Sequence, residues 1–374
     1  MRPFLIMTGG VIMGSVFGRI FTVTTWGESH GKGVGVVIDG CPAGLELSEA
    51  DIQPYMNRRR PGQSKFSTPR NEADEVEILS GVFEGRTTGT PISMTVMNRT
   101  QRSADYSEIA SYYRPGHADF TFDAKYGFRD YRGGGRSSGR ETIARVAAGA
   151  VAAKILSSLG ITVTAYTRSV GDIEISTFDR DEIMNNRLYM PDKAAAEKAE
   201  AYLEELMAQK NSAGGVVECI ISGMPAGVGE TVFDKLDAEL AKAVFSIGAV
   251  KGFEIGEGMK AARLTGLEDN DGFEYKDGRL KKTSNHAGGI MGGMSDGSDI
   301  ILRAAFKATP SVASEQRTVN KNGENITISV KGRHDPIIVP RAVVVVECMT
   351  AVTVCDMLLR NMTSRMDRIE KFYK

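Results

Sequence analysis

Each of the four histidines in this 374-residue sequence lies in a short segment rich in glycine and charged residues. His30 lies in Gly-Glu-Ser-His-Gly, His117 in Arg-Pro-Gly-His-Ala-Asp, His286 in Ser-Asn-His-Ala-Gly-Gly and His334 in Gly-Arg-His-Asp-Pro. Because the histidine pKa lies near neutral pH, polar histidines of this kind suit proton transfer, and neighbouring glycines let the backbone approach a ligand closely. A single such segment is more typical of a tight turn. Four in one chain favour proton chemistry.

The glycine-rich segment 133–141 predicts an anion site. Three glycines, Arg136 and two serines lead directly into an expected helix, whose first backbone N–H groups and dipole favour an anion. Ser138 and Glu141 also have the spacing of a capping box, so simple capping is the alternative for the serine. A cap does not need Arg136, which therefore favours the anion interpretation.

A second set of cations lies outside that segment: Arg58, Arg59, Arg60, Lys65, Arg70 and Arg114. Successive helical residues point about 100° apart, so at most one or two of the three consecutive arginines can face one site. Cations that complement a helix C-terminus are an equally good interpretation of this run. Lys65 follows a proline and is assigned to a loop site.

The segment 332–336 places Asp335 before a proline, which favours extended backbone there. Since successive extended side chains alternate, Arg333 and Asp335 should share one face and His334 should point the other way. We therefore assign Asp335 to the site and a structural role to His334. His286 is expected to tie down its glycine loop.

Other chemistries fit the spacing less well. No two histidines lie within a helical turn, and the nearest carboxylates, Glu28 and Asp119, are isolated, which disfavours a metal site. The sequence contains no GxSxG elbow between a strand and a helix, which disfavours a serine hydrolase. It also contains no GxGxxG motif in such a place, which disfavours an independent nucleotide-binding domain.

The elements that must position these residues are mixed. Strands are expected at 21–25, 34–39, 92–97, 216–221, 300–306, 326–330 and 343–346. Helices are expected after Ser48, from Ser138 to a stop at Gly160, at 193–210, from a cap at Asp234 to Gly248, and near the C-terminus to about Leu359. Regular structure would be costly in the glycine-rich stretch 285–298. The pattern predicts one compact α+β unit with antiparallel sheets, with 13–374 as one domain.

Composition sets further bounds. Hydrophobic content of 41%, charged content of 25% and a net charge of −1 indicate an ordinary globular protein without the positive field that holds nucleic acid. We expect no membrane-spanning run. The four cysteines lack zinc spacing; Cys348 and Cys355 are expected to be buried thiols, and the compartment to be cytoplasmic. Residues 1–12 are expected to be an extension before an initiator at Met13.

Taken together, the segments resemble the chorismate synthase family. The resemblance runs from about Gly14 to Leu359 and rests on long motifs in the family's order. They are GESHGKGVGVVIDGCP (27–42), RRRPGQSKFSTPR, YYRPGHADFTF, GGGRSSGRETIARVAAGAVA (133–152), VFSIGAVKGFEIG, SNHAGGIMGGMSDG and GRHDPIIVPRAVVVVEC (332–348).

The resemblance implies an anti-1,4-elimination of phosphate from 5-enolpyruvylshikimate 3-phosphate, which gives chorismate in the shikimate pathway. It implies reduced FMN without net redox change, NADPH as a possible reductant, and a homotetramer of α+β sandwich subunits that binds neither nucleic acid nor membrane. It assigns His30 to protonating the departing phosphate, His117 to the reduced flavin, and Asp335 to proton removal through flavin N5.

The same resemblance assigns binding residues. For the substrate's anionic groups these are Arg59, Lys65, Arg114 and Arg140. For FMN they are Arg136, Ser137, Ser138, Gly248, Ala249, Gly292, Lys307, Ala308, Thr309, Pro310, Ser311 and Arg333. Two positions depart from the family pattern, since Gly248 replaces a common asparagine and Lys65 a common arginine, which loses bidentate geometry.

Two other functions remain as alternatives. A flavin reductase that consumes NADPH is disfavoured by the missing nucleotide-binding motif. An RNA- or anion-binding module is disfavoured by the balanced charge and the lack of aromatic platforms.

Overall fold

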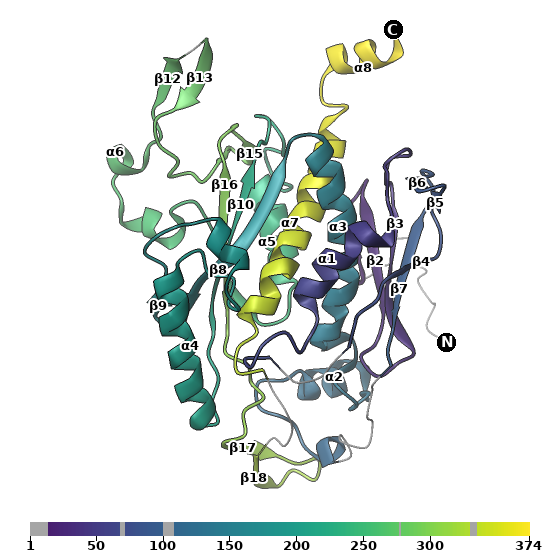
Figure 1. Cartoon of the computed structure of the whole chain (residues 1–374), viewed down its shortest axis with the longest axis vertical. Helices are drawn as coiled ribbons and strands as arrows, with labels where there is room; N and C mark the ends of the chain where they lie inside the picture. Colours follow the sequence, from purple (N-terminus) through teal and green to yellow (C-terminus); the bar gives the residue numbers. More distant parts are fainter. Residues whose placement is uncertain (1–13, 68–71, 100–107, 277, 330–334) are drawn as a thin grey trace, which may run out of the picture.

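The computed structural model of the chain describes residues 14–67, 72–99, 108–276, 278–329 and 335–374. Two antiparallel sheets lie on opposite sides of a central layer of helices, and smaller hairpins and helices surround this sandwich (Figure 1). The predicted α+β class with antiparallel sheets is therefore confirmed.

The first sheet has the strand order β1-β2-β3-β7-β4. Its strands are β1 (Val16–Phe17), β2 (Thr22–Gly27), β3 (Gly33–Asp39), β7 (Ile92–Met97) and β4 (Glu77–Ile78). In β3 the side chains of Val34, Val36 and Ile38 are buried at alternate positions, which is the period of a strand that packs one face on a core. The β2–β3 register pairs Trp26 with Gly35, so the loop that carries His30 closes this hairpin.

The second sheet has the order β11-β16-β10-β8-β9. Its strands are β11 (Val250–Ile255), β16 (Ile300–Phe306), β10 (Gly215–Ser222), β8 (Thr162–Val170) and β9 (Ile173–Glu174). The β16 strand alternates buried and half-buried residues along its whole length, with Ile300, Leu302 and Ala304 inside. It has the bounds that the sequence predicts.

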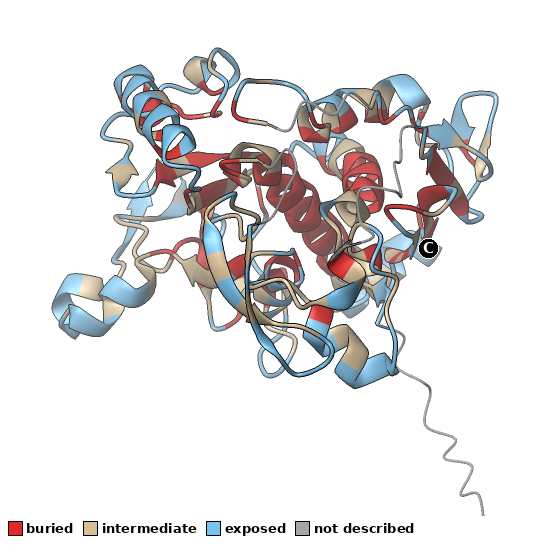
Figure 2. Ribbon diagram, turned by 90° about the horizontal axis from the view of Figure 1, so that it is seen from below, coloured by how far each residue is buried: buried red, intermediate tan, exposed pale blue. Residues whose placement is uncertain are grey.

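The central layer consists of α1 (Glu49–Arg59), α3 (Thr142–Ser158), α5 (Leu236–Phe245) and α7 (Val339–Asn361). Figure 2 shows these buried helices surrounded by exposed segments. The alanines of α3 allow the close packing that the sequence predicts, and Gly149 is the tightest point, because a Cβ there would overlap Cys348 of α7. The thiols of Cys348 and Cys355 are buried and free, as expected.

The predicted strand at 343–346 is wrong, because these four valines lie inside α7. A short apolar run cannot be assigned to strand or helix from periodicity alone, and β-branched residues favour the strand locally. Here both sides of the helix are covered, since Val343 to Met357 are all buried between the two sheets. Tertiary packing therefore decides the conformation.

Helix α7 also bears on the expected lack of a membrane-spanning run. Among the described residues it is the one helix that is long and apolar enough to cross a membrane by length and composition. However, 89% of its most apolar 18-residue stretch is buried inside the protein. This burial fits the core helix of a soluble protein.

The peripheral elements complete the chain. The helices are α2 (Asp119–Tyr126), α4 (Lys193–Ala208), α6 (Gly266–Asp269) and α8 (Met366–Tyr373). The hairpin strands are β5 (Val82–Phe83), β6 (Arg86–Thr87), β12 (Phe273–Lys276), β13 (Arg279–Lys282), β14 (Ile290–Met291), β15 (Met294–Ser295), β17 (Glu315–Val319) and β18 (Asn325–Ser329).

Two local predictions need correction. Asp234 does not cap α5, whose N-cap is Lys235; the Asp234 carboxylate instead pairs with Arg360 at 2.9 Å. The glycine-rich stretch 285–298 is mostly irregular, as expected, but it contains the short β14–β15 hairpin.

Candidate active site

His30 lies in the β2–β3 loop and packs against Gly133 of the glycine-rich segment. It is 8% exposed, and a Cβ at position 133 would overlap its ring. The Ser29 hydroxyl donates to the Gly133 carbonyl oxygen at 3.2 Å and lies 3.3 Å from His30 Nδ1. Only glycine therefore fits at 133, and the loop and the glycine-rich segment form one unit around the imidazole.

Arg136 fastens the glycine-rich segment to β2. Its Nη2 donates to the Thr25 hydroxyl at 2.7 Å, and Nη1 donates to the Gly27 carbonyl oxygen at 3.2 Å. Gly133, Gly134 and Gly135 all have positive φ angles, which glycine adopts without strain. In this conformation the Arg136 guanidinium contacts the protein's own oxygens, so its predicted contact with an anion stays a prediction.

Ser138 caps the turn that leads into α3. Its hydroxyl accepts from Arg140 N at 3.3 Å and begins the 3-10 turn Gly139–Glu141. The other half of the predicted capping box is wrong, because the Glu141 carboxylate accepts from the Thr25 hydroxyl at 2.9 Å and from Arg145 Nε at 2.7 Å. The α-helix itself begins one turn later than expected, at Thr142.

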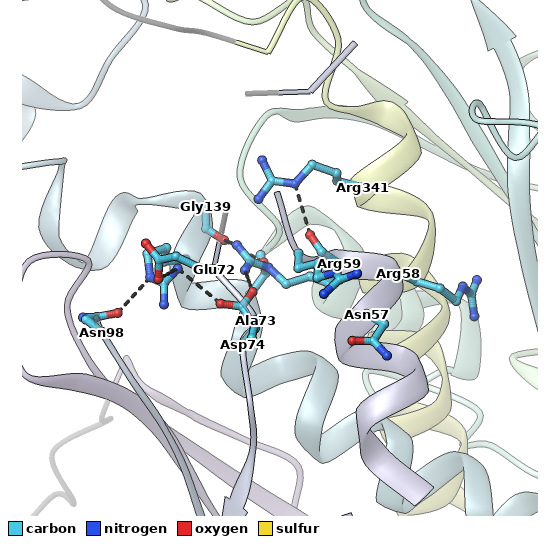
Figure 3. Close-up of polar contacts among 12 residues, drawn as sticks. Asn57, Arg58, Arg59, Glu72, Ala73, Asp74, Asn98, Gly139 and Arg341 are labelled. Carbon is cyan, nitrogen blue, oxygen red and sulfur yellow. Dashed lines mark hydrogen bonds and ion pairs between the residues drawn. The ribbon is translucent and has the colours of Figure 1, made fainter. Parts of the chain in front are cut away.

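A group of charged and polar residues lies beside this turn. We call Arg59, Glu72, Asp74, Asn98 and Arg140 the Asp74 cluster (Figure 3). Arg59 is 1% exposed, and each of its three nitrogens donates a hydrogen bond: Nη1 to Asp74 Oδ2 at 2.6 Å, Nη2 to the Gly139 carbonyl oxygen at 2.9 Å and Nε to the Thr142 hydroxyl at 3.0 Å.

Burial is the main influence on the Arg59 guanidinium. It lowers the pKa of Arg59 to about 10, while Asp74 opposes the shift, and the nearby charges of Arg341 and Arg140 lower the pKa further. Arg59 therefore remains charged at neutral pH, and the Asp74 carboxylate within hydrogen-bond distance stabilises that charge.

Arg140 is held from two sides. Its Nη1 contacts Glu72 Oε2 at 2.6 Å and Asp74 Oδ1 at 3.3 Å, and its Nε donates to Asn98 Oδ1 at 2.9 Å. Its Nη2 is buried and has no hydrogen-bond partner among the described residues. A buried guanidinium N–H without a partner is costly, so this nitrogen is a donor available to an anionic ligand.

Arg58 has a different role from its neighbour. Figure 3 shows its side chain pointing away from Asp74 and Gly139. Its Nη1 and Nη2 donate to the two carboxylate oxygens of Glu347 at 2.7 and 3.0 Å, which ties α1 to α7. This agrees with the prediction that at most one or two of the consecutive arginines can face one site.

Asp335 lies directly before α7 and is held by Arg341. Arg341 Nη1 donates to Asp335 Oδ2 at 2.7 Å, and Arg341 Nε donates to the Arg59 carbonyl oxygen at 3.1 Å. This arginine therefore joins Asp335 to the end of α1. Arg333 and His334, whose relative facing the sequence predicts, lie outside the described residues.

His117 lies in the turn before α2 and contacts the segment 307–311. Its Nδ1 is 2.9 Å from the Pro115 carbonyl oxygen, and its Nε2 is 2.9 Å from the Ser311 hydroxyl. Because a carbonyl can only accept, Nδ1 carries the proton, and the neutral ring then accepts from Ser311. Burial and the positive charge of Arg114 lower the pKa of His117, which favours this neutral form.

The turn that carries His117 packs closely on 307–311. Lys307 Nζ donates to the Gly116 carbonyl oxygen at 2.9 Å, and a Cβ at Gly116 would overlap Pro310. Lys307 N also donates to the Ala249 carbonyl oxygen at 3.0 Å. The structure thus brings together His117, 307–311 and Ala249, while the described contacts do not join Gly292 to them.

The two other predicted substrate cations pair with the protein's own carboxylates. Arg114 Nε and Nη2 donate to Asp119 at 2.8 Å each. Burial would raise the pKa of Asp119, but the bonds from Arg114 outweigh it and hold that pKa below its ordinary value. Lys65 pairs with Glu204 and Glu200 of α4. Of the four, only Arg59 and Arg140 share a carboxylate.

His286 has the structural role that the sequence predicts. Its backbone N donates to Asp271 Oδ1 at 2.7 Å, and its Nδ1 lies 3.2 Å from Glu257 Oε1. The Asp271 carboxylate also pairs with Lys282 at 2.8 Å, and Lys282 pairs with Asp296. These contacts fix the start of the glycine-rich stretch 285–298.

The described residues offer no metal centre. Within the ranges that the structure describes, no three histidine, cysteine, aspartate or glutamate residues could share a metal ion. A cavity of about 480 Å³ runs along Glu72 to Glu77 with Thr95, Met97 and Arg99, beside the Asp74 cluster. The carboxylates of Glu72 and Asp74 in its lining pair with Arg140 and Arg59, which offsets part of its negative charge.

Comparison with known proteins identifies the family. The family model described as chorismate synthase matches residues 21–359 of this chain. The chain belongs to the chorismate synthase family. Chorismate synthase of Agathobacter rectalis is 68% identical over 363 residues, which cover 96% of this chain and 99% of that protein. Chorismate synthase of Methanosarcina barkeri is 56% identical over 353 residues, 93% of this chain and 97% of that protein.

A solved structure agrees. A crystal structure of chorismate synthase superposes with a TM-score of 0.74 at 31% identity and covers 96% of this chain and 97% of that chain. Membership of the family makes this chain a carbon–oxygen lyase of aromatic biosynthesis.

The residues around His117 are compatible with the flavin that the family requires. Thr309 Oγ1 is buried and has no hydrogen-bond partner in the part of the chain that the structure describes. Gly248 is exposed, and a Cβ there would meet nothing within 4 Å, so this turn leaves room for a ligand at the surface. The Thr309 hydroxyl is a donor that a bound flavin could use.

Several residues that contact the predicted site residues are missing from the sequence prediction. They are Ser29, Glu72, Asp74, Asn98 and Arg341. Ser29 lies next to His30 in the Gly-Glu-Ser-His-Gly segment, so its role could have been predicted from the sequence. The acidic run 72–77 signals Glu72 and Asp74 only weakly, because such runs are usually solvated. Nothing in the sequence singles out Asn98.

Proposed function

We propose that this chain removes phosphate from 5-enolpyruvylshikimate 3-phosphate by anti-1,4-elimination and so forms chorismate. The observation that carries the proposal is that one segment, 133–140, packs on the His30 ring through Gly133 and carries Arg140, whose buried Nη2 has no partner among the described residues. A proton donor and an arginine with a spare donor, held by the same segment, suit the departure of a phosphate group.

The residues take the following proposed roles. His30 protonates the phosphate as its C–O bond breaks, and Asp335, oriented by Arg341, takes part in removing the substrate proton. Arg140 binds an anionic group of the substrate, with Arg59, Lys65 and Arg114 as further candidates. His117, kept neutral by burial and Arg114, would stand next to the flavin.

The cofactor proposed is reduced FMN. When bound, reduced flavin supplies electron density transiently and recovers it, so the reaction has no net redox change. The residues proposed to hold it are Arg136, Ser137, Ser138, Gly248, Ala249, Gly292, 307–311 and Arg333. NADPH as a reductant, a homotetramer, a cytoplasmic location and a single domain over 13–374 are further proposals drawn from the family resemblance.

Phosphate release under anaerobic conditions tests this function. The chain, supplied once with chemically reduced FMN and the enolpyruvyl substrate, should form many chorismate molecules per flavin, and the flavin should stay reduced. Product formation that stops at one per flavin, with oxidised FMN accumulating in step, would contradict the lyase and favour an NADPH-consuming flavin reductase.

A further inference from the structure

Asp74 joins two arginines that the family resemblance assigns to the same anionic substrate. Its Oδ2 accepts from Arg59 Nη1 at 2.6 Å, and its Oδ1 accepts from Arg140 Nη1 at 3.3 Å. The Asp74 side chain is completely buried, and the Arg59 side chain is 2% exposed. One carboxylate therefore neutralises and spaces two guanidinium groups that would otherwise repel each other.

The backbone conformation of Asp74 also depends on these two arginines. Its φ angle is +48°, in the left-handed region that few residues other than glycine adopt. Aspartate tolerates this region better than most residues, but the conformation persists only where the surroundings impose it. Here the two arginines impose it, because turning the carboxylate away would leave both without this partner.

The two arginines differ in what they can still bind. Arg59 is fully enclosed, and all of its nitrogens donate to the protein. Arg140 is fixed through Nη1 and Nε, yet its Nη2 is buried without a partner in the described ranges. The contacts thus hold the Arg140 guanidinium in place and leave one of its donors unused.

We propose that Asp74 is a positioning residue for substrate binding. Through the carboxylate that it shares with Arg59, it fixes the Arg140 guanidinium so that Nη2 is available to an anionic group of the substrate. Arg59 then supports this arrangement from within the protein. The inference rests on the proposed function, and it assigns different roles to two arginines that the family resemblance treats alike.

A double-mutant cycle between Asp74→Asn and Arg140→Gln tests the proposal. Asp74→Asn should raise the KM for the enolpyruvyl substrate by roughly tenfold or more, the scale of a lost charged hydrogen bond, with kcat much less affected. In the Arg140→Gln background the same change should have little further effect on KM, because the residue it positions is gone. The Kd of FMN should stay unchanged.

Glu347→Gln is the matched control. It removes another buried carboxylate that pairs with an arginine of α1, Arg58, on the other side of that helix. It should lower the free energy of unfolding without changing KM. A KM for Asp74→Asn within about twofold of the wild type, or full additivity with Arg140→Gln, would overturn the proposal.

Two further measurements keep the test decisive. Asp74→Asn leaves the Arg59 charge buried without its partner, so the variant could fail to fold. In that case Asp74→Glu, which keeps the negative charge but moves the carboxylate by one methylene group, enters the same cycle with the same criteria. Turnover by the wild-type chain is measured first: its absence contradicts the proposed function, whereas turnover with unaltered KM values in the variants contradicts only the role of Asp74.

Discussion

The histidines show how the same side chain takes different roles from its partners. His30 packs on Gly133, and His117 forms hydrogen bonds with Pro115 and Ser311. His286 contacts the carboxylates of Glu257 and Asp271. The glycine-rich settings of all three are visible in the sequence. The sequence predicts a structural role for His286, and the family resemblance predicts catalytic roles for His30 and His117. Their partners lie up to 194 positions away along the chain, so the sequence alone could not predict the contacts that fix each ring.

We expect His30→Ala to lower turnover by roughly a hundredfold or more, the usual scale of a lost general acid. His286→Ala is the matched control: it should lower the thermal stability, because it loses the Glu257 contact, and leave turnover nearly unchanged. Both are measured as kcat with reduced FMN and as melting temperature. Turnover lost in His286→Ala and kept in His30→Ala would reverse the assignment.

His117 should make stability depend on pH in a defined direction. Its pKa in the folded protein lies below the ordinary value of 6.5, so between these two pKa values the unfolded chain binds more protons than the folded one. Stability is therefore complete above 6.5 and falls as the pH drops towards the folded pKa. In urea titrations at several pH values, His117→Gln should lose less stability over this window than the wild type; parallel curves would argue against the shift.

At the scale of elements, local patterns predict a helix or strand well where the segment's own sequence determines its conformation. The strand over 300–306 is β16, and the helix after Ser138 is α3, shifted by one turn. The predicted strand at 343–346 is wrong because burial on all sides, by α3, α5 and α1 together with strands β8 and β10, stabilises the helix. The sequence misses the Asp74 cluster for a related reason, since its ion pairs join segments as far apart as Glu72 and Arg140, which are 68 positions apart.

The fit between the β2–β3 loop and the glycine-rich segment predicts a difference between adjacent glycines. Both Gly133 and Gly134 have positive φ angles, so alanine at either costs about 1–2 kcal/mol of stability. Only the Cβ at 133 would overlap His30. Gly133→Ala should therefore lose more stability than Gly134→Ala, and its folded fraction should also lose turnover well beyond Gly134→Ala. Equal kcat values in the two variants would show that the contact between Gly133 and His30 does not affect catalysis.

At the scale of the whole molecule, cofactor binding should raise the free energy of unfolding. A ligand at a hundred times its Kd adds about 2.7 kcal/mol to the free energy of unfolding when it binds only the folded state. Thr309→Val removes a buried hydroxyl that has no partner among the described residues, so it should scarcely change stability without FMN. With FMN it should reduce the gain, measured by denaturation at increasing FMN. A full gain in the variant would exclude Thr309 as a flavin contact.

The position of α7 in the chain has a consequence for biosynthesis. This helix lies between the two sheets, yet it follows every strand of both sheets in chain order. While the ribosome is still synthesising residues before 339, strands β8 and β10 of the second sheet lack the helix that covers them. The nascent chain therefore exposes apolar strand surface until α7 has been synthesised. We expect chaperones to bind this surface and prevent aggregation.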